Sequence, residues 1–404
     1  MMRSLRAPLA GVKVIDFTRQ YLNYAGLLLA DLGANVTKVE DLASPDPLHT
    51  WFPLHGQASS YYYLLCRNKR TVNLNFRSDM GRSLLRRLAT KADILLENTR
   101  PGTMARLGLD YPTLSKQNPS LIYCSISCFG QKCAKPGHAI NCMAKSGLLS
   151  YSGTDSTPSL AGGLGADMSA VLFANMGLLA ALYRRTNDPA KRGEKVEVAM
   201  AETMMAKNML DFGKLSVDSR AVPVGGKELS NGGFACYNVY KTKDGKYIAV
   251  GATDKRYWDR LCNLLGIGKS KERENFFEPG PGQEMLKSLV GQRIAAKTAS
   301  EWEKAFSSCE CCCNVVKDLK EAVDDPDYSS GQDAVLQHAN VAGKDMKFIR
   351  LPVRMTNTKT TLYREAECAG ESTEKILAEE LGVGPEELAE LRRGGAIPEE
   401  GKHK

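Results

Sequence analysis

The first forty residues run strand, helix, strand, and this order restricts the fold more than any other feature of the chain. Residues 11–16 (GVKVID) have the Val and Ile content of a short strand, and residues 35–39 (NVTKV) form a second one. Between them, residues 22–32 are typical of a helix that ends at Gly33. Two strands joined through a helix lie parallel in one sheet, so we predict an α/β fold built on a Rossmann-like parallel sheet.

The same alternation continues through the first half of the chain. Further strands are predicted at residues 70–75, 93–97, 120–127 and 196–198, and further helices at 80–92, 168–186 and 201–215. The first strand does not lead into the glycine-rich turn of dinucleotide-binding proteins, because Asp16 is followed by Phe-Thr-Arg-Gln. We therefore expect the Rossmann-like topology without NAD binding.

A change in composition marks a second domain. Residues 1–216 are predicted to form the first part of the large domain, and the Gly- and Ser-containing residues 217–233 a linker. Residues 234–325 combine two alternating strands, joined at Lys-Asp-Gly, with helices, which predicts a smaller α+β domain. Residues 326–404 include two predicted amphipathic helices, at 373–381 and 384–394, and are expected to complete the large domain.

Charge and composition narrow the classes of partner. The net charge of +8 suits an anionic small ligand, and no stacked-aromatic or zinc signature accompanies it to suggest nucleic acid. The longest apolar run, residues 170–183, is shorter than the roughly 20 residues of a membrane span and reads as a buried helix. The first ten residues lack the apolar core of a signal peptide, so we expect a cytoplasmic protein without membrane partners.

Four of the twelve cysteines crowd together at positions 309, 311, 312 and 313. Zinc sites usually use two separated Cys-x-x-Cys pairs, whereas three adjacent side chains cannot easily converge on one tetrahedral ion. The other cysteines show no pairing pattern. We expect reduced, partly buried thiols in a reducing compartment, and no metal site.

Two ionisable residues stand in small-residue, apolar stretches and are the strongest candidates for chemistry. His138 lies in Lys-Pro-Gly-His-Ala-Ile-Asn, and Asp167 opens the predicted helix at 168–186. A carboxylate at a helix N-terminus is stabilised as an anion. An imidazole and a carboxylate together can exchange protons with a substrate, whereas Asp167 alone could attack an acyl group. The sequence leaves both reactions open.

An ordered set of motifs carries a family resemblance over nearly the whole chain. The motifs are Pro8–Asp16, Leu29–Val36, Arg67–Arg70, Glu97–Gly102, Arg106–Leu109, Gly137–His138, Tyr240–Gly245, Val250–Ala252 and Leu381–Glu387. Together they resemble the family III CoA-transferases (CaiB/BaiF), which include the 2-methylacyl-CoA racemases. The resemblance implies an interlocked homodimer, in which each active site forms between the large domain of one subunit and the small domain of the other.

The resemblance also implies residue roles. In the racemase branch, the residues matching His138 and Asp167 move the proton α to the thioester on opposite faces, and Asp254 stands where a Glu assists the His. In the transferase branch, the residue matching Asp167 is the nucleophile that forms an acyl anhydride. His138 favours the racemase. The chain departs from the racemase pattern at two positions. Ala139 stands where the racemase motif commonly has Asp, and Asp254 is shorter than the Glu it replaces. A non-catalytic acyl-CoA-binding relative is therefore a third alternative.

Acyl-CoA is the expected small-molecule ligand, with no separate cofactor. The residues predicted to contact CoA are Arg67, Lys69, Arg70, Glu97, Asn98, Arg100 and Arg106. The basic residues suit phosphate groups, and the Glu97–Arg100 segment follows a predicted strand, where open α/β sheets bind ligands. The leading hypothesis is an isomerase that epimerises 2-methyl-branched acyl-CoA. Nucleic-acid binding is the most distant alternative.

Overall fold

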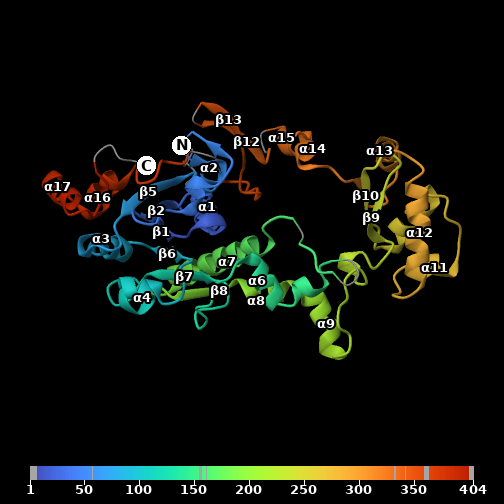
Figure 1. Ribbon diagram of the computed structural model, residues 1–404, viewed down its shortest axis with the longest axis horizontal. Coiled ribbons are helices and arrows are strands. Elements are labelled where there is room, and N and C mark those ends of the chain that lie inside the picture. Colours follow the sequence, from blue (N-terminus) through green and yellow to red (C-terminus); the bar gives the residue numbers. More distant parts are fainter. Residues whose placement is uncertain are drawn as a thin grey trace. The chain divides into compact units, whose positions relative to one another are not determined.

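The computed structural model describes residues 7–399, except 57, 154–156, 161, 332–333, 342 and 359–363. The chain forms two compact units (Figure 1). Unit 1 comprises residues 1–142, 164–204 and 326–404, and unit 2 comprises residues 143–163 and 205–325. The last segment of unit 1 thus begins at the residue where the sequence predicts the return to the large domain.

Six parallel strands form the sheet of unit 1 in the order β5–β2–β1–β6–β7–β8. The strands are β1 (Lys13–Phe17), β2 (Asn35–Asp41), β5 (Lys69–Leu74), β6 (Ile94–Glu97), β7 (Ile122–Ser127) and β8 (Lys195–Ala199). β2, β5, β6 and β7 are almost wholly buried, as expected for a sheet covered on both faces. Numbered along the chain, this order is the Rossmann order 3-2-1-4-5-6, which confirms the predicted fold class.

The order reverses between β1 and β6. The chain builds the sheet outward from β1 to β5, then crosses back to β6 and continues to β8 on the other side. In open α/β sheets the crevice at such a reversal, beyond the carboxyl ends of the strands, is where ligands bind. The segments that follow β1 and β6 therefore border the predicted binding position.

Helices cover both faces of this sheet. The helices and 3₁₀ turns of the first part of the chain are η1 (Gln20–Leu22), α1 (Asn23–Asp31), η2 (Pro47–Thr50), α2 (Ser60–Cys66), α3 (Asp79–Thr90), α4 (Thr103–Leu107), α5 (Tyr111–Leu114), α6 (Ala139–Lys145), α7 (Gly165–Asn187) and α8 (Met200–Lys207). α7 packs on α1, β7 and β8. On the other face, Leu84, Leu85 and Leu88 of α3 join the core with the strands.

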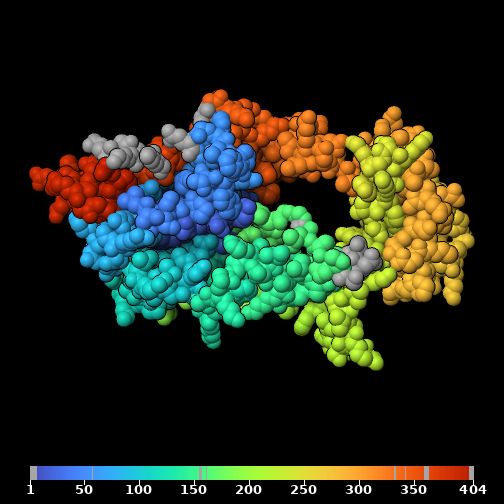
Figure 2. All heavy atoms as spheres, in the orientation of Figure 1, coloured from blue at the N-terminus to red at the C-terminus, as the bar shows by residue number. Residues whose placement is uncertain are grey.

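The end of the chain packs onto its beginning. α16 (Thr373–Leu381) contacts β5 and α3, and Leu391 of α17 (Pro385–Arg393) belongs to the same core. Figure 2 shows these C-terminal atoms in red beside the blue N-terminal ones. Arg70 of β5 forms an ion pair with Glu379 of α16 at 2.6 Å, so charge and apolar packing both secure the return segment.

A hairpin in the return segment was not predicted. It consists of β12 (Leu336–Val341) and β13 (Lys344–Ile349), and α15 (Pro326–Ser329) precedes it. Its sequence, LQHANV and KDMKFI, lacks regular apolar alternation, so periodicity gave no strand signal. Val341 and Phe348 nevertheless pack into a small core with Tyr62 of α2. A two-stranded piece, β3 (Leu54–His55) and β4 (Ala58–Ser59), lies in the same part of unit 1.

The helix predicted at residues 201–215 is interrupted. α8 ends at Lys207 and α9 (Met209–Val217) begins two residues later. Asn208 separates them, because its side chain is engaged outside the helix: Tyr151 donates to it at 2.8 Å, and it donates to the carbonyl of Ser146 at 2.7 Å. These bonds also explain why residues 205–216, expected in the large domain, group with residues 143–163 in unit 2.

Unit 2 is a small α+β structure. Its sheet is antiparallel in the order β11–β10–β9, with β9 (Tyr237–Lys241), β10 (Tyr247–Gly251) and β11 (Cys313–Val315). Its remaining elements are η3 (Leu148–Tyr151), η4 (Leu229–Asn231), α10 (Lys255–Leu264), α11 (Lys271–Glu274), α12 (Gly282–Ile294), α13 (Ala299–Ser307) and α14 (Leu319–Val323). Trp258 and Trp302 are fully buried in its core, which supports an independent hydrophobic unit.

α7 extends further than its apolar run suggests. Within the described part of the chain it is the single helix whose length and hydropathy would suffice to cross a membrane. The core helix of a soluble protein satisfies the same two criteria. Residues such as Val171, Ala174 and Leu178 of α7 are buried in unit 1, whereas Leu172 and Met176 are exposed.

Candidate active site

A cavity of about 620 Å³ opens at the carboxyl ends of the strands, at the reversal of strand order. Its lining comes from unit 1 alone, from the segments that follow β1, β2, β6, β7 and β8 and from the start of α7. The lining residues that bear on chemistry are Arg19, Gln20, Tyr21, Trp51, Asn98, Arg100, Cys128, Cys133, Lys135, His138 and Asp167. The cavity volume lies in the range of small-molecule binding sites.

Asp167 lies in the first turn of α7, as predicted, and its carboxyl group is partly buried. Burial raises the pKa of Asp167 above its usual range, and the nearby His138 and a backbone N–H oppose the change. A carboxyl group with a raised pKa can hold and release a proton more readily near neutral pH. The raised pKa suits proton transfer, whereas the backbone N–H at the start of α7 favours the anionic form that nucleophilic attack requires.

His138 shares this cavity and interacts electrostatically with Asp167. Its backbone N–H donates to Oδ1 of Asn141 at 2.9 Å, which caps the start of α6 and places the side chain at its beginning. Within the described residues, the imidazole ring makes no hydrogen bond to the protein, so both ring nitrogens are open to a ligand. The structure therefore brings the two predicted acid–base residues together in one cavity.

Asp254, the third predicted catalytic residue, belongs to unit 2. It is the exposed residue preceding α10 in unit 2, and its side chain makes no cap hydrogen bond there. It is not among the residues that line the cavity of unit 1. Its predicted assistance to His138 stays a prediction.

The predicted CoA contacts fall into two groups. Asn98 and Arg100 line the cavity, and Asn98 bonds both backbone polar groups of Arg19, at 2.9 and 3.3 Å. Glu97 is buried and does not line the cavity, and it accepts hydrogen bonds from the backbone N–H and hydroxyl of Thr99, both at 2.7 Å. Arg106 is exposed and outside the lining, where it bonds the hydroxyl of Thr103 at 3.3 Å.

The basic residues at 67–70 serve internal ion pairs. Arg67 bonds Asp31 at 2.8 Å, and the fully buried Lys69 bonds the equally buried Asp16 at 2.8 Å. Arg70 pairs with α16 as described above. None of the three lines the cavity, and their charges are already matched by carboxylates. Their predicted contact with CoA phosphates stays a prediction to which this geometry lends no support.

Several residues that line the cavity were not among the ligand contacts predicted from the sequence. Arg19 and Lys135 add positive charge to the cavity beside Arg100, and Tyr21 and Trp51 add an aromatic pair with ring centroids 5.3 Å apart. Arg19 could have been suspected because it follows the first strand directly, at the edge where ligands bind. Lys135 and Trp51 lie in loops whose course depends on tertiary contacts.

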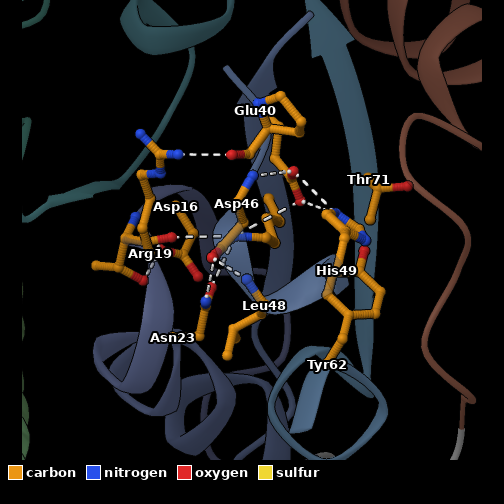
Figure 3. A network of polar contacts seen from close by, with 12 residues as sticks. Asp16, Arg19, Asn23, Glu40, Asp46, Leu48, His49, Tyr62 and Thr71 are labelled. Carbon is orange, nitrogen blue, oxygen red and sulfur yellow. Dashed lines mark hydrogen bonds and ion pairs between the residues drawn. The ribbon is translucent and has the colours of Figure 1, made fainter. Parts of the chain in front are cut away.

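A buried ion-pair network lies behind one wall of the cavity (Figure 3). Lys38 of β2 and Asp46 are both inaccessible to solvent, and their charged atoms lie 3.0 Å apart. The ammonium group of Lys38 also donates to Oδ1 of Asn23 at 2.8 Å and to the carbonyl of Thr18 at 3.0 Å. Lys38 lowers the pKa of Asp46 well below its usual range against the opposing effect of burial, so the pair stays ionised.

Asp46 connects two loops that border the cavity. Its carboxylate accepts the backbone N–H of Gln20 at 3.1 Å and that of Leu48 at 3.1 Å. Gln20 has a positive φ of 57°, a backbone conformation that needs such support. The guanidinium of Arg19 donates to the carbonyl of Pro45 in the same loop pair. The network thus holds the Arg19–Leu22 wall against the Pro47–Trp51 wall.

We expect Glu97 to make the protein less stable as the pH rises. Burial raises its pKa from 4.5 to about 7, against the opposing bonds from Thr99. The folded state therefore binds a proton that the unfolded state releases between these values, and stability falls over pH 4.5–7 by about 3 kcal/mol at most. Denaturant unfolding of wild type and Glu97→Gln at several pH values measures this, because the variant lacks the titration. Parallel stability curves for the two proteins would contradict the prediction.

Comparisons with known proteins identify the family of this chain. The sequence model of the family described as CoA-transferase family III matches residues 9–373 of this chain. An acyl-CoA transferase of Fusarium pseudograminearum is 31% identical over 98% of this chain and 89% of its own, and the human succinyl-CoA:glutarate CoA-transferase is 28% identical over 98% and 91%. The human alpha-methylacyl-CoA racemase is 29% identical over 95% and 96%.

A solved structure shares the fold. A CaiB/BaiF family protein from Brucella suis superposes with a TM-score of 0.79 at 24% identity, covering 93% of this chain and all of that one. Relatives named transferase and racemase match to similar extents, so the comparisons place the chain in the family without choosing between the two reactions. Because the family match covers residues 9–373 and a relative that is 31% identical aligns over 98% of the chain, the chain belongs to CoA-transferase family III.

Proposed function

We propose that this protein epimerises the α-carbon of 2-methyl-branched acyl-CoA thioesters by proton transfer through His138 and Asp167. The observation that carries the proposal is the presence of both groups in one cavity, close enough to interact electrostatically. In one direction the neutral imidazole removes the α-proton, and the protonated Asp167 delivers a proton to the opposite face. Two such groups allow either configuration to be deprotonated and regenerated.

The charges around the cavity support an acyl-CoA ligand. Arg19, Arg100 and Lys135 contribute cationic groups to a lining that otherwise holds Asp167 as its acidic residue, within the part of the chain that the structure describes. Guanidinium and ammonium groups suit the phosphates of CoA. The lining also contains apolar side chains, among them Leu22 and Met200, which suit the acyl part of such a ligand.

CoA transfer through an Asp167 anhydride is the second candidate. The first turn of α7 favours the anionic carboxylate that a nucleophile needs. The printed names of several relatives are those of CoA-transferases. In that reaction His138 would only position the thioester.

Hydrogen exchange separates the two candidates. One enantiomer of a 2-methylacyl-CoA is incubated with the enzyme in heavy water and without an acceptor acid. The epimerase incorporates deuterium at the α-carbon and produces the other epimer, and both signals fall in His138→Ala and in Asp167→Ala. Absence of exchange, with CoA transfer appearing once a carboxylic acid is added, would establish the second candidate instead. Absence of both would indicate an acyl-CoA-binding protein.

We further propose a homodimer. Leu172, Met176 and Tyr183 are exposed along one side of α7, at the spacing of a single helix face. A second copy of the chain would bury these side chains. Light scattering after gel filtration at micromolar concentration should give twice the mass of 44.2 kDa, and a monomer mass would refute the proposal.

Arg100 should contribute to binding more than to chemistry. We expect Arg100→Gln to raise the KM for acyl-CoA about tenfold with little change in kcat, because a charge-assisted contact is lost equally in ground and transition states. Steady-state kinetics measures both constants. Arg106→Gln is the matched control, since Arg106 is exposed and outside the cavity lining. Equal effects of the two substitutions would contradict the assignment.

A further inference from the structure

The cavity holds two thiols that the proposed reaction does not use. Cys128 follows the last residue of β7, and Cys133 lies in the loop before His138. Both are partly exposed and both line the cavity together with Asp167. A nucleophilic sulfur inside a ligand-binding cavity can react with whatever sulfur the ligand brings there.

Cys128 is the better placed of the two. Its thiol donates to the carbonyl of Gly137 at 3.0 Å, which directs the sulfur toward the segment that carries His138. The thiol of Cys142 in α6 donates to the backbone carbonyl of Cys128 at 3.4 Å. The side-chain interaction with Cys142 lowers the pKa of Cys128, although burial and Asp167 oppose this. The carboxyl group of Asp167 lines the same cavity as the sulfur. Cys128 is therefore a partly exposed thiol in the same cavity as the predicted reacting carboxylate, and its lowered pKa favours the thiolate form that reacts with disulfides.

The ligand of the proposed function carries its own sulfur to this place. In an acyl-CoA, the thioester sulfur is bonded to the carbonyl carbon, which is bonded to the α-carbon. An α-carbon within proton-transfer reach of Asp167 necessarily brings the CoA sulfur into the same part of the cavity. The cationic residues that suit CoA phosphates would hold a CoA disulfide in the same way.

We propose that Cys128 is a site of reversible covalent modification by CoA disulfides, an inference that rests on the acyl-CoA ligand of the proposed function. The Cys128 thiolate attacks one sulfur of the CoA disulfide, the S–S bond breaks, and the second CoA leaves as a thiolate that takes a proton from water. The exchange needs no further oxidant, because one disulfide bond replaces another. The bound CoA then occupies the cavity beside Asp167 and excludes acyl-CoA until a thiol reductant releases it.

The test uses the full-length reduced protein, CoA disulfide and peptide mass mapping. We expect one CoA on Cys128, removed by dithiothreitol, and a loss of activity in proportion to the modified fraction. Cys128→Ser should lack this modification, whereas Cys133→Ser, altered in the same cavity, should retain it. Mapping of the wild-type protein decides the site even if a variant fails to fold: modification on Cys133 alone, or none in the cavity, would overturn the proposal.

A second disulfide tests recognition of the nucleotide. Glutathione disulfide lacks the CoA phosphates, and we expect it to modify Cys128 about tenfold more slowly at equal concentration. The exposed Cys312 of unit 2 provides the reference, because it should react with both disulfides at similar rates. Equal rates of the two disulfides at Cys128 would overturn a CoA-directed reaction.

Desulfo-CoA, which lacks the thiol, separates this inference from the proposed function. If calorimetry detects binding of desulfo-CoA, and desulfo-CoA slows the modification of Cys128, the acyl-CoA ligand and the modification of Cys128 are both supported. Binding of desulfo-CoA without modification of Cys128 would overturn the modification alone. Absence of desulfo-CoA binding, together with absence of α-proton exchange, would overturn the acyl-CoA ligand itself.

Discussion

Replacing Asp167 by Asn should lower the rate of α-proton exchange about 10³-fold, since the amide neither accepts nor delivers the proton. The amide is nearly isosteric with the carboxyl group, and Asp167 is only partly buried, so the fold should change little. Deuterium incorporation from heavy water measures the rate. CoA transfer would be lost as well, because the amide is a poor nucleophile.

The control for this substitution is Asp79→Asn. Asp79 occupies the same kind of position, the first turn of a helix, but its side chain on α3 is almost fully exposed and outside the cavity lining. The Asp79→Asn substitution removes the same charge without altering the cavity, so the rate of α-proton exchange should stay unchanged. An Asp167→Asn protein with at least a tenth of the wild-type exchange rate would exclude Asp167 as an obligatory proton carrier in that reaction.

Lys38→Met should destabilise the protein by about 3–5 kcal/mol, the largest stability effect we expect. The substitution leaves the carboxylate of Asp46 buried without its partner at 3.0 Å, and that of Glu40 without its partner at 3.7 Å. It also removes the donor to Asn23. Urea unfolding followed by circular dichroism measures the loss.

Lys195→Met is the matched control, because Lys195 of β8 is exposed and pairs with Glu197 at the surface. Such pairs contribute about 0–1 kcal/mol. The double variant Lys38→Met/Asp46→Asn should recover part of the loss, since one of the unpaired charges is gone. Equal losses in Lys38→Met and Lys195→Met would show that the buried pair contributes no more than a surface pair.

The same network has a consequence for pH. The pKa of Asp46 is lowered in the folded state, so its contribution to stability is complete above the unfolded value of 3.8 and is lost as the pH falls below it. Glu97, whose pKa is raised, acts in the opposite direction at higher pH. Protonation of Asp46 therefore lowers stability as the pH falls into the acidic range, and ionisation of Glu97 lowers it as the pH rises toward 7.

Local sequence patterns predicted most of the secondary structure. The predicted strand at 120–127 is β7 and the helix at 373–381 is α16, because buried strands and amphipathic helices leave apolar periodicities that can be read along the chain. The hairpin of β12 and β13 left no such pattern, since few of its side chains are buried. The helix predicted at 201–215 was wrong at Asn208, where tertiary hydrogen bonds override helix propensity.

The sequence by itself determined the parallel α/β class and singled out His138 and Asp167, the two ionisable residues that the structure places in one cavity. Both follow from local information: the spacing of apolar residues and the identity of ionisable groups in apolar surroundings. Only the tertiary structure decided which cations lie at the cavity. Arg19 and Lys135 line it, whereas Lys69, a stronger candidate by sequence position, is buried against Asp16. The reason is that charge pairing depends on strand order and on contacts between residues far apart in the chain, which no local pattern records.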